Sequence, residues 1–252
     1  MLTINHLSKQ FGGLQVIHSF SMHVKPGQIH SIIGPNGAGK TTLFNLITGL
    51  YRADQGEIIF QDQKLNHLKP YEIARLGISR TFQNIRLFQH MTVAENIKMG
   101  QSTQVDTGLR SLIPFYNAKK QKQLDEETEQ LLSLLELEEK RDWNAGRLSY
   151  GDQRRLEIAR ALATGAKLIL LDEPAAGMNP EESRKLNEVI LKINRNGVAV
   201  LLIEHDMSVV MEISDYVTVL NFGQKIAEGT PSEVQQNTAV LEAYLGQEEE
   251  AV

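Results

Sequence analysis

A glycine-rich segment with a lysine near its end constrains this chain more than any other feature. Residues 34–41 read GPNGAGKT, the complete Walker A pattern, and they follow an apolar run that ends at Ile33. The residues after Lys40 have helical character. A buried strand, a glycine-rich turn and a helix in this order surround a phosphate with backbone N–H groups at the positive end of the helix. The segment therefore predicts a nucleotide-binding α/β fold.

The loop supplies phosphate and metal ligands in this prediction. Lys40 reaches the β- and γ-phosphates, and Thr41 offers its hydroxyl to Mg²⁺. The backbone of the turn binds further phosphate oxygens. The predicted nucleotide ligands of this segment are Asn36, Gly37, Ala38, Gly39, Lys40, Thr41 and Thr42. The alternative interpretation is an ordinary glycine-rich turn before a helix.

The composition suits one large soluble α/β unit or a core with an attached subdomain. The chain has 252 residues, of which 41% are hydrophobic, and no cysteine. Disulfides and thiolate metal sites are thereby excluded. No apolar run approaches the ~20 residues of a membrane span, and the N-terminal residues lack an apolar signal region. The net charge of −5 argues against a general nucleic-acid surface, so no nucleic-acid partner is expected.

Strands and helices alternate along much of the chain. Predicted strands cover residues 2–4, 19–24, 56–60, 168–171 and 198–203, and the apolar run that ends at Ile33. A helix is predicted over 181–195, and a hairpin around residues 221–223. This order predicts a parallel core with an antiparallel β element beside it.

The middle of the chain has a different character. Residues 119–137 predict a helix, in which Leu124, Leu131 and Leu135 share a face with Thr128. Residues 101–117 predict an irregular connection or a short helix. We expect a helical insertion in the α/β core here.

Two adjacent carboxylates follow a second buried strand. Asp172 and Glu173 come directly after the apolar residues 168–171, a Walker B pattern. Ligands bind at the carboxyl ends of strands in open α/β sheets, so both should lie near the phosphates. Asp172 suits Mg²⁺ binding through coordinated water, and Glu173 suits a general base. A solvated acidic turn is the alternative.

Further motifs complete the pattern of a known family. Residues 148–153, LSYGDQ, resemble the ABC signature, usually LSGGQ; Gln83 resembles the Q-loop glutamine, and His205 the switch histidine. With both Walker motifs, these follow one another in the family order over nearly the whole chain. The chain resembles an ABC transporter ATPase subunit. The resemblance implies a P-loop NTPase fold, with one nucleotide-binding domain over residues 1–252 and a helical subdomain at about 88–162.

The resemblance also assigns roles to individual residues. ATP is sandwiched in a head-to-tail dimer, where Ser149 and Gly151 contact the γ-phosphate held by the opposing subunit. Gln83 and His205 are catalytic together with Glu173, and Gln83 joins Thr41 and Asp172 as a metal ligand.

An aromatic residue near the N-terminus is assigned to the adenine. Phe11 matches the aromatic side chain that stacks on the base in this family, and Val16 lies against the same ring. The alternative for Phe11 is a core residue at a strand end.

The chain departs from the family pattern at several positions. Tyr150 replaces a signature glycine and Asp152 the usual glutamine, so neither is counted as a ligand. In the D-loop, residues 175–180, Asn179 stands where aspartate is common.

Longer stretches resemble one branch, the ATPase subunits of branched-chain amino acid importers. They include residues 77–83, the signature helix, the D-loop and residues 203–207. The resemblance implies transmembrane permease subunits as partners, a second ATPase subunit that is identical or related, and indirectly a solute-binding protein. It also implies a peripheral location at the cytoplasmic face of the membrane. Importers of urea or short-chain amides share much of this pattern and remain alternatives.

The family's permease docking groove corresponds here to residues 83–117. Arg86, Leu87, Phe88 and Met91 suit an interface anchor, while a subdomain core is the alternative for the three apolar residues. Non-transport classes fit less well. DNA-repair ABC ATPases need a long coiled-coil insertion and translation-associated ones carry two cassettes, whereas kinases and GTPases lack the signature.

Overall fold

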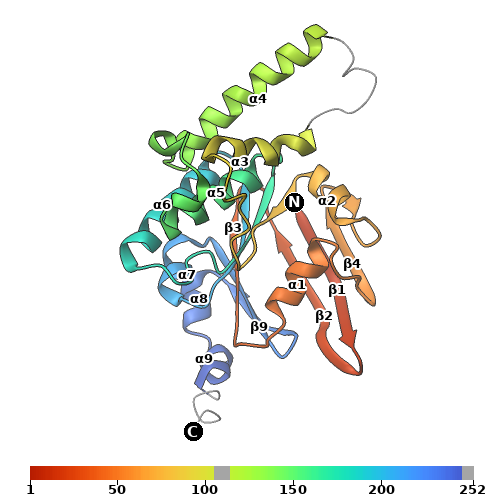
Figure 1. Cartoon of the computed structure of the whole chain (residues 1–252). Helices are drawn as coiled ribbons and strands as arrows, with labels where there is room; N and C mark the ends of the chain where they lie inside the picture. Colours follow the sequence, from red (N-terminus) through yellow and green to blue (C-terminus); the bar gives the residue numbers. More distant parts are fainter. Residues whose placement is uncertain (105–113, 246–252) are drawn as a thin grey trace.

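Two β-sheets with helices packed around them form the part of the chain that the computed structural model describes, residues 1–104 and 114–245 (Figure 1). The strands are β1 (Leu2–Phe11), β2 (Leu14–Val24), β3 (Ile29–Ile33), β4 (Gln55–Phe60), β5 (Gln63–Lys64), β6 (Ile78–Arg80), β7 (Leu168–Asp172), β8 (Ala199–Ile203), β9 (Tyr216–Asn221) and β10 (Gln224–Gly229). The α-helices are α1 (Lys40–Ile47), α2 (Pro70–Leu76), α3 (Val93–Gly100), α4 (Pro114–Leu134), α5 (Tyr150–Leu162), α6 (Pro180–Arg195), α7 (Met207–Ile213), α8 (Pro231–Gln235) and α9 (Thr238–Leu245). Short 3₁₀ helices cover Gln101–Gln104, Glu138–Lys140 and Ala145–Arg147.

The two sheets differ in strand direction, as the sequence predicts. The larger sheet has the order β10-β9-β3-β8-β7-β6, and its strands are parallel except for the β9–β10 hairpin. The smaller sheet has the order β2-β1-β4-β5 and is antiparallel. The parallel core and the antiparallel β element are thereby confirmed. No helix in the described residues is long and apolar enough to cross a membrane.

The buried strands of the larger sheet serve two cores. In β7, Leu168 and Leu170 pack with α1 and the antiparallel sheet, whereas Ile169 and Leu171 pack with the helices α3, α5 and α6 on the opposite face. Successive side chains of a strand point to opposite faces, so a strand covered on both sides is apolar throughout. This explains the unbroken apolar runs that precede Gly34 and Asp172.

The first hairpin is longer than the sequence predicts. Strands β1 and β2 pair from Leu2–Val24 to Phe11–Leu14, with register shifts after Ile4, Leu7 and Lys9. His6 and Ser19 both have a φ of 46°. These irregularities interrupt the apolar–polar alternation, because a bulge shifts the following side chains to the other face. The predicted strands 2–4 and 19–24 are therefore only parts of two longer strands, and the pairing is regular from residues 2–4 to residues 22–24.

Helix α4 begins earlier than predicted, and Leu124, Thr128 and Leu135 of the predicted face are buried. It starts at Pro114, a residue that is well tolerated in a first helical turn, and ends at Leu134. Thr128 and Leu132 are fully buried, whereas Leu131 is only partly buried. The buried stripe thus runs along positions four residues apart. Of the predicted irregular segment 101–117, residues 105–113 lie outside the described part.

Candidate nucleotide-binding and catalytic site

The turn between β3 and α1 can be made only by glycine at two positions. Gly34 has a φ of 147° and Gly39 one of 105°. A Cβ on Gly34 would lie 1.9 Å from the carbonyl oxygen of Leu220, and a Cβ on Gly39 2.8 Å from that of Val16. The backbone must therefore approach its neighbours closely, which a side chain would prevent. The predicted strand, glycine turn and helix are all present.

Lys40 lies at the centre of this turn. Its Nζ donates hydrogen bonds of 2.6 Å to the carbonyl of Gly34 and 2.9 Å to that of Pro35, and the residue is buried. Burial lowers the pKa of Lys40, while the carboxylates of Glu173 and Asp172 act to raise it. The glycine turn and the end of β7 therefore lie close together.

Asp172 forms an ion pair with Arg80, a residue that none of the sequence motifs identified. Its Oδ2 accepts a 2.8 Å hydrogen bond from Nη2 of Arg80, and both side chains are buried. The other end of the guanidinium donates to Asn45 on α1 at 2.6 Å. A charged residue at the end of β6, the strand paired with β7, was the available signal. Arg80 fixes the Asp172 carboxylate relative to α1.

The donor set suits a hard divalent cation. Arg80 contacts one oxygen of Asp172, and Thr41 presents an exposed side chain on the first turn of α1. Within residues 1–104 and 114–245, no group of three or more His, Cys, Asp or Glu could enclose a metal ion. Mg²⁺ is commonly held by one or two carboxylates together with water and substrate phosphates. Thr41 and Asp172 fit that pattern. They would supply two ligands, and water and substrate phosphates would supply the others.

Glu173 contacts both residues that the family pattern pairs with it. Nε2 of Gln83 donates to Oε2 of Glu173 at 3.2 Å, and Nδ1 of His205 lies 3.9 Å from its Oε1. Glu173 has a φ of 47°, and its amide donates to the carbonyl of Ile203 at 2.9 Å. The end of β8 thus fixes a strained backbone that turns this carboxylate towards Gln83 and His205.

Glu204 is a second carboxylate next to this cluster that the sequence motifs did not identify. Glu204 is buried and accepts hydrogen bonds from the backbone N–H groups of Ala175, at 3.4 Å, and His205, at 3.3 Å. Burial is the main cause that raises the pKa of Glu204. An acidic residue that ends the apolar strand β8 was the signal in the sequence. Glu204 ties the start of the D-loop to the main chain at His205.

Ser149 and Gly151 line a pocket that does not include the glycine turn. Ser149 is the N-cap of α5, where its Oγ accepts from the amide of Asp152 at 3.2 Å. Both residues line a pocket of about 200 Å³ with Met178, Lys185 and other side chains, none of which comes from residues 34–42. The structure therefore brings Lys40, Asp172, Glu173, Gln83 and His205 together, whereas Ser149 and Gly151 line a pocket to which none of these five residues contributes.

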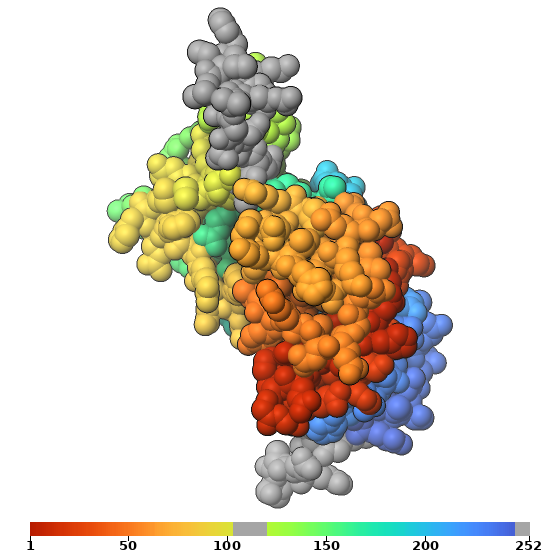
Figure 2. All heavy atoms as spheres, turned by 90° about the vertical axis from the view of Figure 1, so that its right-hand side faces the viewer, coloured from red at the N-terminus to blue at the C-terminus, as the bar shows by residue number. Residues whose placement is uncertain are grey.

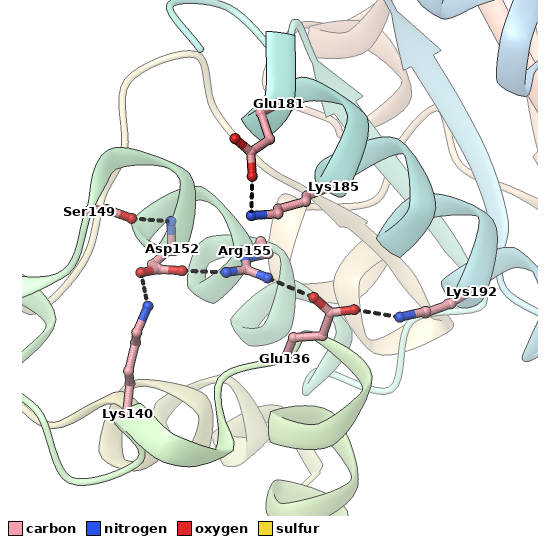
Figure 3. A network of polar contacts seen from close by, with 8 residues as sticks. All are labelled: Glu136, Lys140, Ser149, Asp152, Arg155, Glu181, Lys185 and Lys192. Atoms are coloured by element: carbon pink, nitrogen blue, oxygen red, sulfur yellow. Dashed lines mark hydrogen bonds and ion pairs between the residues drawn. The ribbon is translucent and has the colours of Figure 1, made fainter. Parts of the chain in front are cut away.

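Asp152 points into a network of cations (Figure 3). Its carboxylate pairs with Lys140 and Arg155, and Arg155 continues to Glu136 at 3.2 Å. Burial by itself raises the pKa of Asp152, but hydrogen bonds from Lys140, Arg155 and Ser149 outweigh it and keep that pKa below the usual value. The negative charge of Asp152 is thus neutralised by Lys140 and by Arg155 of α5.

Replacing Asp152 measures how much this network contributes to the free energy of unfolding. We expect Asp152→Asn to lower the free energy of unfolding at pH 7 by about 2 kcal/mol, since it removes a buried charge-assisted acceptor. The pKa of Asp152 is lower in the folded chain than in the unfolded chain. Its carboxylate therefore stabilises the fold at pH values above the unfolded pKa, and this contribution is lost as the pH falls through the folded pKa. The difference from wild type should therefore shrink below about pH 4. Urea unfolding at pH 7 and at pH 3.5 measures it.

Glu181→Gln is the matched control, because Glu181 forms an exposed pair with Lys185 on α6 (Figure 3). Removing that pair should change the free energy of unfolding by less than about 0.5 kcal/mol. Equal effects of the two substitutions at pH 7 would contradict the interpretation of Asp152.

Of the two predicted adenine-stacking residues, Val16 lies against the glycine turn. The carbonyl oxygen of Val16 approaches Gly39, as described above. Phe11 at the end of β1 is 40% exposed, so the core alternative does not describe it. Its ring meets Tyr51 edge-on at 5.1 Å between centroids, and Nζ of Lys9 lies 5.1 Å from its centroid. Tyr51 is a second aromatic residue that the sequence reasoning did not select.

Asn179 has a structural task that does not need a negative charge. It caps α6, with Oδ1 accepting from the amide of Glu182 at 3.0 Å, while Glu182 Oε2 accepts from the amide of Asn179 at 3.2 Å. Asn and Asp are about equally good N-caps. The replacement of Asp by Asn at this position therefore preserves the helix start.

Comparisons with known proteins agree with this geometry. Residues 17–176 match the family model described as ABC transporter. The chain belongs to the ABC transporter family. Residues 224–250 of this ABC ATPase also match the model described as branched-chain amino acid ATP-binding cassette transporter.

Relatives of this ABC ATPase align along nearly their whole length. It is 45% identical over 251 residues to the high-affinity branched-chain amino acid transport ATP-binding protein LivG of Escherichia coli strain K12, covering 98% of each chain. It is 42% identical to the corresponding protein BraF of Pseudomonas aeruginosa, again over 98% of each. The solved ADP conformation of MJ1267, an ATP-binding cassette of an ABC transporter, is 35% identical with a TM-score of 0.86 over 98% of both chains. The predicted ABC ATPase fold and ATP-hydrolysing class are confirmed.

Proposed function

We propose that this chain is the ATP-binding and ATP-hydrolysing subunit of an importer of branched-chain amino acids. The observation that carries the proposal is the cluster of Glu173, Gln83 and His205 at the ends of parallel strands, opposite Lys40. A carboxylate held beside two polar side chains, next to a phosphate-binding turn, suits proton abstraction from an attacking water. ATP-driven closure of two such subunits would drive transport through separate membrane subunits.

The residues divide the work on the nucleotide. Backbone N–H groups of the turn hold the phosphates, Lys40 neutralises the γ-phosphate charge, and Phe11 and Val16 cover the adenine. Thr41, Asp172 and Gln83 would hold Mg²⁺, which supplies electrostatic stabilisation of the phosphate charge. Glu173 takes the proton of the water at its carboxylate, while Gln83 and His205 orient the reacting groups. The nucleotide ligands of the turn are Asn36, Gly37, Ala38, Gly39, Lys40, Thr41 and Thr42.

A second ATPase subunit completes each site in this proposal. Ser149 and Gly151 lie in a pocket to which residues 34–42 do not contribute. A hydroxyl and an N–H group at the start of a helix form a suitable donor set for phosphate. They would serve the γ-phosphate held by the opposing subunit, which is either a second copy or a related ATPase.

The permease subunits would dock between the core and the helices of the insertion, which we place at residues 88–162. A groove of about 670 Å³ lies there, between α2 on one side and the segment 82–102 with α5 on the other. Figure 2 shows these surfaces, orange for α2 and yellow for the following segment, side by side. Leu87 and Phe88 both line the groove, but Leu87 also packs against the core cluster, whereas Phe88 is 47% exposed. The core alternative thus describes Leu87 better than Phe88.

Such docking would bring the chain to the cytoplasmic face of the membrane. A solute-binding protein on the opposite side would select the solute and reach this subunit only through the permeases.

Phe88→Ala tests the groove. We expect the isolated variant to bind ATP normally, because Phe88 contacts no residue of the nucleotide cluster. Its ring stacks against Arg160 at 5.6 Å in the groove, so loss of this anchor should weaken binding to the permeases by about tenfold or more. Co-purification with the permeases and coupled transport measure this. Trp143→Ala is the control, because Trp143 is also exposed but does not line the groove. Normal assembly and transport of Phe88→Ala would remove it from the interface.

The solute requires its own experiment. Deleting the gene in the native organism should abolish high-affinity uptake of labelled leucine, isoleucine and valine, and the wild-type gene should restore it while Glu173→Gln should not. Loss of urea or acetamide uptake with normal leucine uptake would assign the subunit to one of the alternative importers.

A further inference from the structure

Tyr150, which replaces a glycine of the usual signature, makes specific contacts with the D-loop. Its hydroxyl donates to the carbonyl of Ala176 at 3.2 Å. Its ring lies against Gly177, where a Cβ would be 3.8 Å from the ring carbon Cε1. Gly177 has a φ of 78°, a conformation suited to glycine. Tyr150 therefore joins the start of α5 to the segment that follows Glu173.

Arg154, one turn later on α5, joins the same tyrosine to the Q-loop. The residue is fully buried, and its Nη2 donates to the Tyr150 hydroxyl at 3.1 Å and to the carbonyl of Gln83 at 2.9 Å. Its Nη1 donates to the carbonyl of Phe82 at 2.8 Å and to Oε2 of Glu157 at 3.0 Å. The planar fork of a guanidinium suits several such acceptors at once, and Glu157 supplies the opposite charge.

These contacts close a ring that passes through Glu173. The side chain of Gln83 donates to Glu173 at 3.2 Å, and the amide of Ala176 donates to the carbonyl of Glu173 at 3.1 Å. The ring therefore runs from Glu173 through Gln83, Arg154, Tyr150 and Ala176 back to Glu173. Each member is restrained from two sides, so that opening one link loosens the carboxylate at the far side.

We propose that Tyr150 and Arg154 are positioning residues that hold the Glu173 carboxylate in its catalytic orientation by closing this ring through the chain's own signature helix. The proposal rests on the proposed role of Glu173 as general base. It explains why a bulky tyrosine is accommodated at a signature glycine position: its hydroxyl links two loops that surround the reacting groups. A small displacement of a general base is costly, because proton transfer depends on distance and direction.

Tyr150→Phe opens the ring with little change of shape. We expect kcat for ATP hydrolysis by the full-length chain to fall about 3–10-fold, as for the loss of one hydrogen bond. KM for ATP should stay within about twofold, because no substrate contact is removed. Tyr71→Phe is the control, since Tyr71 on α2 is exposed and lies outside the ring. An unchanged kcat for Tyr150→Phe, or a raised KM with normal kcat, would overturn the proposal.

A double-variant cycle distinguishes positioning from a general structural effect. We expect kcat for ATP hydrolysis by the double variant Arg154→Lys, Tyr150→Phe to be about equal to that of the slower single variant. Once one link of the ring is lost, losing a second link should have little further effect. Effects that multiply would contradict a shared ring. If Arg154→Lys does not fold, Gln83→Ala replaces it in the same cycle with the same expected outcome.

Glu173→Gln in the same assay separates this proposal from the proposed function. Hydrolysis by Glu173→Gln at the wild-type rate would reject the general base itself. Slow hydrolysis by Glu173→Gln, together with normal hydrolysis by Tyr150→Phe, would reject the ring alone.

Discussion

Glu173→Gln should reduce ATP hydrolysis by about 10²–10⁴-fold, which is the usual contribution of a positioned general base. The amide keeps the size of the side chain and can still accept a hydrogen bond from Gln83, but it has no useful affinity for a proton. The unusual backbone at Glu173, with its φ of 47°, is anchored by the carbonyl of Ile203 and does not depend on the carboxylate. The substitution therefore isolates proton transfer.

ATP binding should survive in Glu173→Gln, because the Lys40 turn is unchanged. A dimer trapped with ATP should accumulate and be visible by size-exclusion chromatography. Glu188→Gln is a matched control, since Glu188 forms an exposed pair with Arg184 on α6. Near-normal turnover of Glu173→Gln in the complex assembled with its permeases would reject the assignment of the base.

The positions of the residues at the ends of the buried strands could be predicted from the sequence, because the apolar runs indicate burial and the alternation of strands and helices indicates a parallel sheet. Apolar runs before Gly34 and before Asp172 indicate strands covered on two faces, and parallel strands place their carboxyl ends at one edge. Glu173 and His205 follow two such strands, β7 and β8, which are neighbours in the sheet. Their proximity needed only the fold class.

Side chains that hold these residues in place were harder to predict. Arg80 and Asp172 are separated by 92 residues, and Tyr150 and Ala176 by 26. No local period relates such pairs. Glu204 follows an apolar strand, just as Asp172 does, yet its carboxylate is buried against the backbone instead of facing the phosphate site. Sequence position alone does not distinguish these two outcomes.

The departures from the family pattern are explained by contacts rather than by composition. In the sequence, Tyr150 is a substitution without an evident reason, and Asp152 brings a negative charge into the signature motif. In the fold, Tyr150 reaches the D-loop and Asp152 pairs with Lys140 and Arg155. Both contacts depend on how α5 packs against segments that are distant in the sequence, which a motif does not encode.

Lys40→Ala should impair ATP binding and hydrolysis together. Loss of the cation at the γ-phosphate should raise the Kd for ATP by about tenfold or more and lower kcat by about 10²–10³-fold, as for removal of a transition-state donor. The carbonyls of Gly34 and Pro35 also lose their shared donor, and the carboxylates of Asp172 and Glu173 lose the nearby positive charge. Repulsion between these carboxylates and the phosphates should then weaken binding further.

Isothermal titration with ATP and steady-state hydrolysis measure the two effects separately. Lys64→Ala is the control, because Lys64 is an exposed lysine of the antiparallel sheet that pairs with Glu57. It should bind and hydrolyse ATP as the wild type does. Affinity and turnover that are both unchanged in Lys40→Ala would show that the glycine turn does not hold the phosphates. A raised Kd with unchanged kcat at saturating ATP would instead limit Lys40 to binding, because a transition-state contact must appear in kcat.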